Sequence, residues 1–235
     1  MSGHMKRLAA PRKWAIPRKT ERWVVKSSPG PHKLTESLPL ILVVRDRLKL
    51  CDTAKEARYI IGQHEIMVDG KVVTNYKHPV GFMDVISIPK QKEHYRVLLD
   101  TRGKIQLIPI TKEESKWKLS RIENKTTVKG GKTQLNLHDG RNILLPKNKY
   151  KVCDVLKIDL EKQKILGAYS FEKGNLAMFI GGKHIGRLAA ITDMKVTRSP
   201  MPNMVSFESF STSQEYVFVV GKDTAEITIP EESML

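Results

Sequence analysis

Apolar residues recur at intervals of three and four positions over residues 38–48, which is the period of an amphipathic helix. A second helix is expected to begin after Asp52 or Thr53, because either side chain can accept a hydrogen bond from the first helical turn. Glu56 lies three residues after Thr53 and can complete a capping box with it. Gly62 marks the expected end of this helix. The pattern therefore predicts two short helices in succession.

After the second helix the pattern changes to short runs rich in β-branched residues. Glu65–Val68 and Lys71–Thr74 flank Asp69-Gly70, a dipeptide that is typical of a two-residue hairpin. Beyond Pro89 nearly every apolar run has the length of a strand, interrupted only by a short helix carrying Trp117. The expected strands are residues 84–88, 96–99, 104–110, 121–128, 133–137, 142–145, 155–160, 164–170, 175–180, 188–192, 205–210 and 215–220.

These elements predict a multi-domain α+β protein. The helix pair and hairpin at residues 37–90 resemble the small RNA-binding module called the S4 domain, or alpha-L motif. Short strands at close spacing predict two small β-barrel-like domains after it, at residues 91–170 and 171–235. Residues 1–36 form a basic arm in front of all three.

The arm contains four prolines and little apolar periodicity, so we expect it to be extended and poorly ordered when free. Trp14 and Trp23 depart from this composition, because aromatic residues are rare in purely solvated tails. Two interpretations remain open. The two side chains pack against a neighbouring domain, or one of them stacks on bases or riboses when the arm folds onto RNA.

The distribution of charge along the chain indicates what kind of partner the protein binds. The 235 residues include 41 Lys or Arg and 25 Asp or Glu, a formal net charge of +16. Residues 1–36 carry +7 and residues 91–170 carry +9, whereas residues 37–90 carry +2 and residues 171–235 carry −2. A surplus of this size usually indicates a polyanionic partner. The longest apolar run, Leu38–Val44, is far shorter than the roughly 20 residues that span a bilayer, which favours RNA over a membrane.

An S4-type surface meets RNA with cationic groups that contact phosphates and fix position without reading sequence. Taken singly, each such residue is more commonly a solvated charge; together, and with the arm before them, they indicate RNA binding. The candidates in the arm are Lys6, Arg7, Arg12, Lys13, Arg18, Lys19 and Arg22. The candidates in the S4-type module are Arg45, Arg47, Lys49, Thr53, Lys55, Arg58, Lys71, Asn75 and Lys77.

A glycine-rich loop, Gly181–Arg187, lies between two apolar runs. It is not a phosphate-binding P-loop, because an alanine stands at the first glycine position of that motif and His184 follows the lysine. It resembles the KOW motif, a loop between two strands of a small barrel in several ribosomal proteins and transcription factors. That resemblance implies that Gly186 takes the motif's glycine position, with Lys183 and Arg187 near RNA. An ordinary glycine-rich hairpin is the alternative.

The residues that enzymes and metal sites require do not cluster in this sequence. The seven histidines stand singly, and neither a nucleophile elbow nor a dinucleotide fingerprint occurs. We therefore expect no catalytic residue, no metal and no cofactor. Cys51 and Cys153 lie far apart, which favours free thiols in a reducing compartment over a disulfide. The N-terminus lacks the apolar segment of a secretory signal.

Eight short blocks of sequence extend over almost the whole chain: Lys6–Pro11, Gly30–Leu34, Ser37–Leu40, Asp69–Val72, Pro79–Ile88, Asp100–Gly103, Gly174–Leu176 and Val219–Lys222. In this order they resemble landmarks of the archaeal and eukaryotic small-subunit ribosomal protein S4e family. The second and fifth blocks together are far more specific than the S4 pattern alone. The chain ends soon after Gly221, without the longer basic tail of eukaryotic members, so an archaeal member is expected.

The resemblance implies a non-enzymatic constituent of the small ribosomal subunit that binds and stabilises folded ribosomal RNA. Its partners would be that RNA and neighbouring ribosomal proteins, with no membrane contact and a monomeric state outside the ribosome, in the cytoplasm. Two rivals are an RNA-modifying enzyme that uses an S4 module for targeting and a transient translation or transcription factor. The acidic balance of residues 171–235 leaves open whether that domain contacts RNA or protein.

Overall fold

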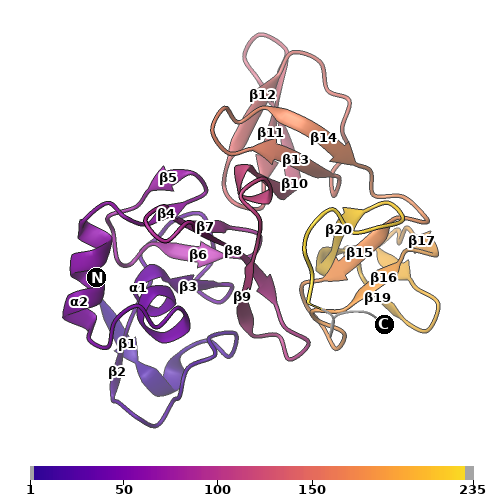
Figure 1. Ribbon diagram of the computed structural model, residues 1–235. Coiled ribbons are helices and arrows are strands. Elements are labelled where there is room, and N and C mark those ends of the chain that lie inside the picture. The colour runs from indigo at the N-terminus through magenta and orange to yellow at the C-terminus, as the bar shows by residue number, and fades with distance from the viewer. Residues whose placement is uncertain (1–2, 231–235) are drawn as a thin grey trace. The chain divides into compact units, whose positions relative to one another are not determined.

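The predicted helix pair is present, but its first helix begins later than the apolar period suggests. The computed structural model describes residues 3–230, and in it α1 spans Leu40–Leu42 and continues as a π-helical turn, η2 (Val43–Arg47) (Figure 1). Leu38 lies instead in β3 (Ser37–Pro39), because a residue that precedes proline is pushed out of the helical region. Pro39 then occupies the cap position, where its missing N–H costs nothing.

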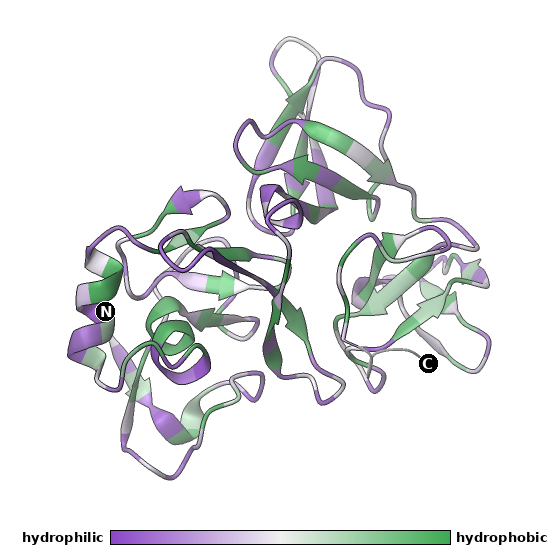
Figure 2. Ribbon diagram, in the orientation of Figure 1, coloured by the Kyte–Doolittle hydropathy of each residue, from purple (hydrophilic) through white to green (hydrophobic). Residues whose placement is uncertain are grey.

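The second helix, α2 (Ala54–Gly62), confirms the capping prediction. The hydroxyl of Thr53 accepts a hydrogen bond from the Glu56 N–H at 3.3 Å, and the Glu56 carboxylate accepts one from the Thr53 N–H at 3.3 Å. The helix buries Ala57 and Ile61 and leaves its other face in solvent. Hydrophilic and hydrophobic residues alternate along it in Figure 2.

A five-stranded sheet completes the S4-type module and extends past it. Its strand order is β5-β4-β7-β8-β9, and only the first three strands lie within the expected module. Val85 pairs with Arg96, so the sheet runs through the boundary expected at residue 90. The bounds of its strands are β4 (Met67–Val68), β5 (Lys71–Val72), β7 (Val85–Ile88), β8 (Glu93–Leu99) and β9 (Ile105–Pro109); a separate strand, β6 (Pro79–Gly81), pairs with β3.

The N-terminal segment is folded, which corrects the expectation of a poorly ordered arm. Its strands β1 (His4–Lys6) and β2 (Trp23–Val25) pair, and a 3₁₀ turn, η1 (Arg7–Ala9), follows β1. Trp14 is only 2 % exposed, and its indole N–H donates to the Ser37 carbonyl at 2.5 Å. The first interpretation of the tryptophans therefore holds for Trp14, whereas Trp23 is 44 % exposed.

The described residues divide into two compact units, one of residues 3–98 and 104–118 and one of residues 99–103 and 119–230. The second unit contains a five-stranded antiparallel sheet in the order β12-β11-β10-β13-β14. Its edge strands, β12 and β14, do not pair with each other, so the sheet is not closed by hydrogen bonds. The sequence instead predicts a barrel-like domain, in which the edge strands would pair. The strands are β10 (Trp117–Val128), β11 (Lys132–Leu137), β12 (Asn142–Leu145), β13 (Val155–Asp159) and β14 (Ile165–Tyr169).

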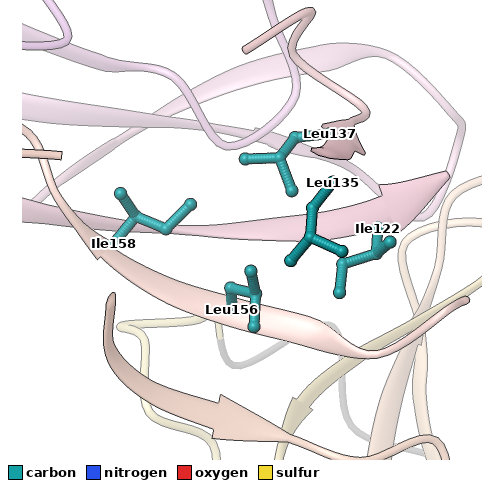
Figure 3. Close-up of a cluster of buried hydrophobic side chains, with 5 residues drawn as sticks. All are labelled: Ile122, Leu135, Leu137, Leu156 and Ile158. Carbon is teal, nitrogen blue, oxygen red and sulfur yellow. The ribbon is translucent and has the colours of Figure 1, made fainter. Parts of the chain in front are cut away.

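One face of this sheet carries its core. Five side chains meet there, as Figure 3 shows: Ile122, Leu135, Leu137, Leu156 and Ile158. They come from β10, β11 and β13, where alternate positions point to the same face. Trp117 begins β10 instead of lying on the expected helix, which is a single 3₁₀ turn, η3 (Glu114–Lys116).

The remaining strands form two three-stranded sheets, with orders β16-β15-β20 and β17-β18-β19. A strand expected at residues 205–210 is shorter, because the Phe207 N–H turns back to the Phe210 carbonyl at 2.8 Å. Strand β17 was not predicted from the sequence. The bounds are β15 (Leu176–Phe179), β16 (Leu188–Ala190), β17 (Asp193–Lys195), β18 (Met204–Ser206), β19 (Ser211–Ser213), η4 (Gln214–Tyr216) and β20 (Val217–Gly221).

Within residues 3–230, no helix combines the length and apolarity that crossing a membrane would require. Both cysteines are free thiols.

Candidate nucleic-acid interface

Tyr76 brings two of the predicted cations together on the first unit. The guanidinium carbon of Arg58 lies 4.8 Å from the centroid of the Tyr76 ring, and Nζ of Lys77 lies 5.3 Å from the same centroid. Arg58 comes from the exposed face of α2, and Lys77 comes from the loop after β5. Because an aromatic face attracts cations, the ring holds both charges beside each other. Two separate segments thus present one positive patch.

Lys77 also lines a hollow of about 590 Å³. The rest of its wall comes from Gly3 and residues 26–34, including Lys26 and Lys33. These two lysines were not among the predicted contacts. The signal that could have found them was their position in the basic arm, which the structure folds against the S4-type module.

Two of the predicted polar contact residues also hold the local structure. The Asn75 amide oxygen accepts from the Lys77 N–H at 3.0 Å, and its nitrogen donates to the Ser28 hydroxyl at 3.3 Å. Thr53 is occupied as the cap of α2. Asn75 therefore positions Lys77, and Thr53 positions the helix that carries Arg58.

A second hollow, of about 570 Å³, lies in the N-terminal segment. Four of the predicted cations line it together with Leu8, Thr20 and Glu21; they are Lys6, Arg18, Lys19 and Arg22. The Arg18 guanidinium donates a hydrogen bond to the Leu8 carbonyl at 3.1 Å, which holds the side chain in place. A concave site with four cations and one carboxylate is suited to an anion such as a phosphate.

Arg7 is different, because its side chain is buried inside the N-terminal segment. It is 5 % exposed, and its Nε donates to the Pro17 carbonyl at 2.5 Å. A second nitrogen lies 3.3 Å from the Glu21 carboxylate. In this structure its guanidinium cross-links the two halves of the segment.

The other predicted cations of the first unit remain open to a partner to different degrees. Arg45 is engaged by its neighbour, since its Nε lies 2.6 Å from the Asp46 carboxylate, and this hydrogen bond raises the pKa of Arg45. Lys13 and Arg47 are half-buried. The exposed members are Arg12, Lys49, Lys55 and Lys71.

The glycine-rich loop of the second unit is fixed by close backbone contact. Gly186 has a φ of +78°, and a Cβ atom there would lie 2.5 Å from the Asp100 backbone. The requirement for glycine is thus explained by packing against the turn at residues 100–103. Lys183 and Arg187 are exposed on either side of it.

A buried ionic cluster underlies the S4-type hairpin, and no pattern in the sequence predicts it. The Lys118 ammonium lies 2.5 Å from the Asp69 carboxylate and 3.2 Å from the Asp84 carboxylate. His32, in the N-terminal segment, contacts the other oxygen of Asp84 at 2.9 Å. Burial by itself would raise the pKa of Asp84, but the charges of His32 and Lys118 and the Gly81 N–H outweigh it and hold that pKa well below its usual range.

This cluster is structural in character. Asp84 ties the N-terminal segment to β7, and Asp69 accepts from the Val85 N–H at 2.9 Å. Every charged member is thereby paired, as burial demands. Across residues 3–230 no group of three or more His, Cys, Asp or Glu side chains is arranged to hold a metal ion.

Family models match three parts of the chain. The S4 domain matches residues 39–86, the RS4NT domain matches residues 1–35, and the ribosomal family S4e matches residues 91–165. The first of these agrees with the helix pair and hairpin of the S4-type module.

Curated relatives match almost from end to end. The chain is 49 % identical over 232 residues to the small ribosomal subunit protein eS4 of Methanothermobacter thermautotrophicus, which covers 97 % of this chain and 96 % of that protein. It is 48 % identical to the protein of the same name from Archaeoglobus fulgidus, over 93 % of each chain. The crystal structure of the 30S ribosomal protein S4e from Thermoplasma acidophilum is 34 % identical, with a TM-score of 0.71, over 80 % of this chain and 96 % of that one.

The helix pair, the hairpin sheet and the surrounding cations define an S4-domain protein whose remaining structure is mostly β-sheet. Within that class the comparisons are specific, and the chain belongs to the small ribosomal subunit protein eS4 family.

Proposed function

We propose that this chain is a structural, non-enzymatic constituent of the small ribosomal subunit that binds and stabilises folded ribosomal RNA in the cytoplasm. The observation that carries the proposal is its 49 % identity, over 97 % of its length, to a protein named for that subunit. Methanothermobacter, Archaeoglobus and Thermoplasma are all archaea, which supports an archaeal protein. Its partners are small-subunit ribosomal RNA and the ribosomal proteins beside it.

The contacts that we propose with RNA are made chiefly by the exposed cations of the first unit. They neutralise phosphates and so fix the position of the protein without reading bases. Two groups contribute: the hollow of the N-terminal segment, with Lys6, Arg18, Lys19 and Arg22, and the S4-type surface around Arg58 and Lys77. The remaining proposed contacts are Arg12, Lys13, Arg45, Arg47, Lys49, Lys55 and Lys71.

For the C-terminal domain we propose the KOW type, with Lys183 and Arg187 toward RNA and Gly186 as the residue that allows the loop its shape. Support comes from the positive φ of Gly186 and from the exposure of both cations. We further propose a functional division into residues 1–36, 37–90, 91–170 and 171–235, a monomeric state outside the ribosome and no membrane contact.

Sedimentation of native cell extract through a sucrose gradient tests the proposal. The expected result is stoichiometric co-migration of the protein with small subunits at both moderate and high salt. A transient factor would leave the subunits at high salt, and an RNA-modifying enzyme would be present at far below one copy per subunit. Either outcome would overturn the proposal.

A further inference from the structure

The five-stranded sheet of the second unit, here called the central sheet, has an outer face formed by β10, β11 and β12. No residue on this face was predicted to contact RNA, yet its composition is unusual. Cross-strand pairs share a face, and the register places Asn124 beside Asn136 and Thr126 beside Gln134. Asn142 lies next to Asn136 on β12. The opposite face holds Leu135, which belongs to the core in Figure 3, so the amide-bearing face points away from that core.

Short polar side chains form a connected surface there. The Gln134 amide nitrogen donates to the Asn136 amide oxygen at 2.8 Å, and the Asn136 nitrogen donates to the Thr126 hydroxyl at 3.2 Å. The face ends in apolar and charged positions, with Leu144 57 % exposed and Lys132 paired with Val128. Three strands give this face a width of about 10 Å.

The charge around this face is predominantly positive, although Glu123, just before Asn124, is exposed and pairs with Arg121. Residues 124–152 contain seven Lys or Arg and one acidic residue, Asp139, which is 2 % exposed and lies 3.4 Å from Arg141. No exposed carboxylate in this stretch therefore offsets the lysines. Five of them are exposed, at the β10–β11 turn and after β12: Lys129, Lys132, Lys147, Lys149 and Lys151.

We infer that this amide face and its five lysines form a second RNA-binding surface, which takes the backbone and minor groove of a double-stranded RNA helix. The inference rests on the proposed function and extends it to a domain in which the sequence predicted no individual contact residue. Lysines on the rim meet phosphates, and the Asn, Gln and Thr side chains meet 2′-hydroxyl groups in the wide, shallow minor groove.

The absence of exposed rings decides between helical and single-stranded RNA. Proteins that hold single strands stack bases on aromatic side chains. Within residues 121–152 the only Phe, Trp or Tyr is Tyr150, which is half-buried and packs against the core of the sheet. A flat face without stacking platforms fits an RNA helix read by shape and backbone.

Chemical footprinting of lysines tests the inference on the full chain. The protein, alone and bound to small-subunit ribosomal RNA transcribed from the source genome, is acylated and analysed by mass spectrometry. We expect Lys129, Lys132 and Lys149 to lose at least three-quarters of their reactivity in the complex. Lys162 and Lys164, at the opposite turn between β13 and β14, are exposed and serve as the reference that stays reactive.

A matched pair of variants gives the affinity. The double substitution Lys129→Gln and Lys132→Gln removes two charges beside one hairpin turn, and Lys162→Gln with Lys164→Gln removes two beside another turn of the same sheet. In filter binding, the first variant should bind this RNA about tenfold more weakly and lower the slope of log K against log salt by about 2, because two phosphate contacts are lost. The second should match the unaltered protein.

The outcomes separate this inference from the proposed function. If RNA binds and protects lysines of the first unit while Lys129 and Lys132 stay reactive, the inference fails and the proposed function stands. If the lysines become protected only in the assembled subunit, a protein covers the face and the inference also fails. If the full chain does not bind the RNA at all, the proposed function itself is overturned.

Discussion

At the scale of single residues, replacing Asp84 is expected to change the stability of the fold most. It is buried and joins Lys118 to His32, so its removal leaves a buried ammonium short of one carboxylate. Breaking a buried charge pair in this way typically costs about 3–5 kcal/mol. We expect Asp84→Asn to lower the free energy of unfolding by about that amount at pH 7, measured by urea titration with tryptophan fluorescence. Asp193→Asn, which breaks an exposed pair with Lys173, should change little.

The same residue predicts how stability depends on pH. Because the folded protein holds the pKa of Asp84 below the ordinary value of 3.8, the unfolded chain takes up the proton more readily. The contribution of Asp84 to stability is therefore fully present above about pH 4 and is lost as the pH falls toward the folded pKa. The Asn variant should lose less stability than the unaltered protein between pH 6 and pH 3. Equal losses would contradict this assignment.

Gly186 offers a second residue-scale prediction. In Gly186→Ala the new Cβ atom meets the Asp100 backbone at 2.5 Å and the residue keeps a positive φ. Gly174→Ala shares the positive φ, but nothing lies within 4 Å of its Cβ, so it measures the conformational strain alone. We expect Gly174→Ala to cost about 1–2 kcal/mol and Gly186→Ala distinctly more, by thermal unfolding. Equal costs would show that packing does not require this glycine.

At the scale of elements, local signals predicted what they control directly. The capping box of α2 and the Asp69-Gly70 hairpin follow from adjacent residues, and both are confirmed. The predicted start of α1 was wrong, because Pro39 forces Leu38 into an extended conformation despite the apolar period. The partners of β8 could not be predicted, since pairing between Val85 and Arg96 depends on which distant strands meet. Adjacent residues therefore predict where an element begins and turns, but they do not predict which strands will pair with it in a sheet.

The N-terminal segment supplies the prediction at this scale. Trp14 anchors the segment by its burial and by its hydrogen bond to the Ser37 carbonyl. Trp14→Ala should therefore lower the free energy of unfolding by about 3–5 kcal/mol. We expect trypsin to cut faster after Arg12, Lys13 and Arg18 in this variant, while circular dichroism retains the signal of the sheets. Trp23→Ala, at a position 44 % exposed, is the control and should be cut at the original rate. If both variants resist trypsin equally, the segment is held by other contacts.

At the scale of the whole molecule, charge and the order of sequence blocks predicted more than secondary structure did. The S4e resemblance and the net charge of +16 identified the family and an anionic partner from the sequence alone. The buried ionic cluster could not be predicted, because His32, Asp69, Asp84 and Lys118 meet only through tertiary folding. The same limit hid the lysine-rimmed face of the central sheet, whose residues show no pattern until the register puts them side by side.

The distribution of charge predicts how the whole chain responds to salt. Binding that neutralises six to ten phosphates loses about 10³–10⁵ in affinity between 50 and 200 mM salt, because condensed counterions are released. The contribution should be uneven, since residues 1–170 carry all of the positive excess and residues 171–235 carry −2. We expect Arg58→Gln with Lys77→Gln to reduce the salt slope for ribosomal RNA by about 2. Lys183→Gln with Arg187→Gln removes the same charge and should reduce the slope less. A larger reduction from the second pair would make the C-terminal loop the dominant phosphate contact, and the acidic balance of its domain would then be no guide to where RNA lies.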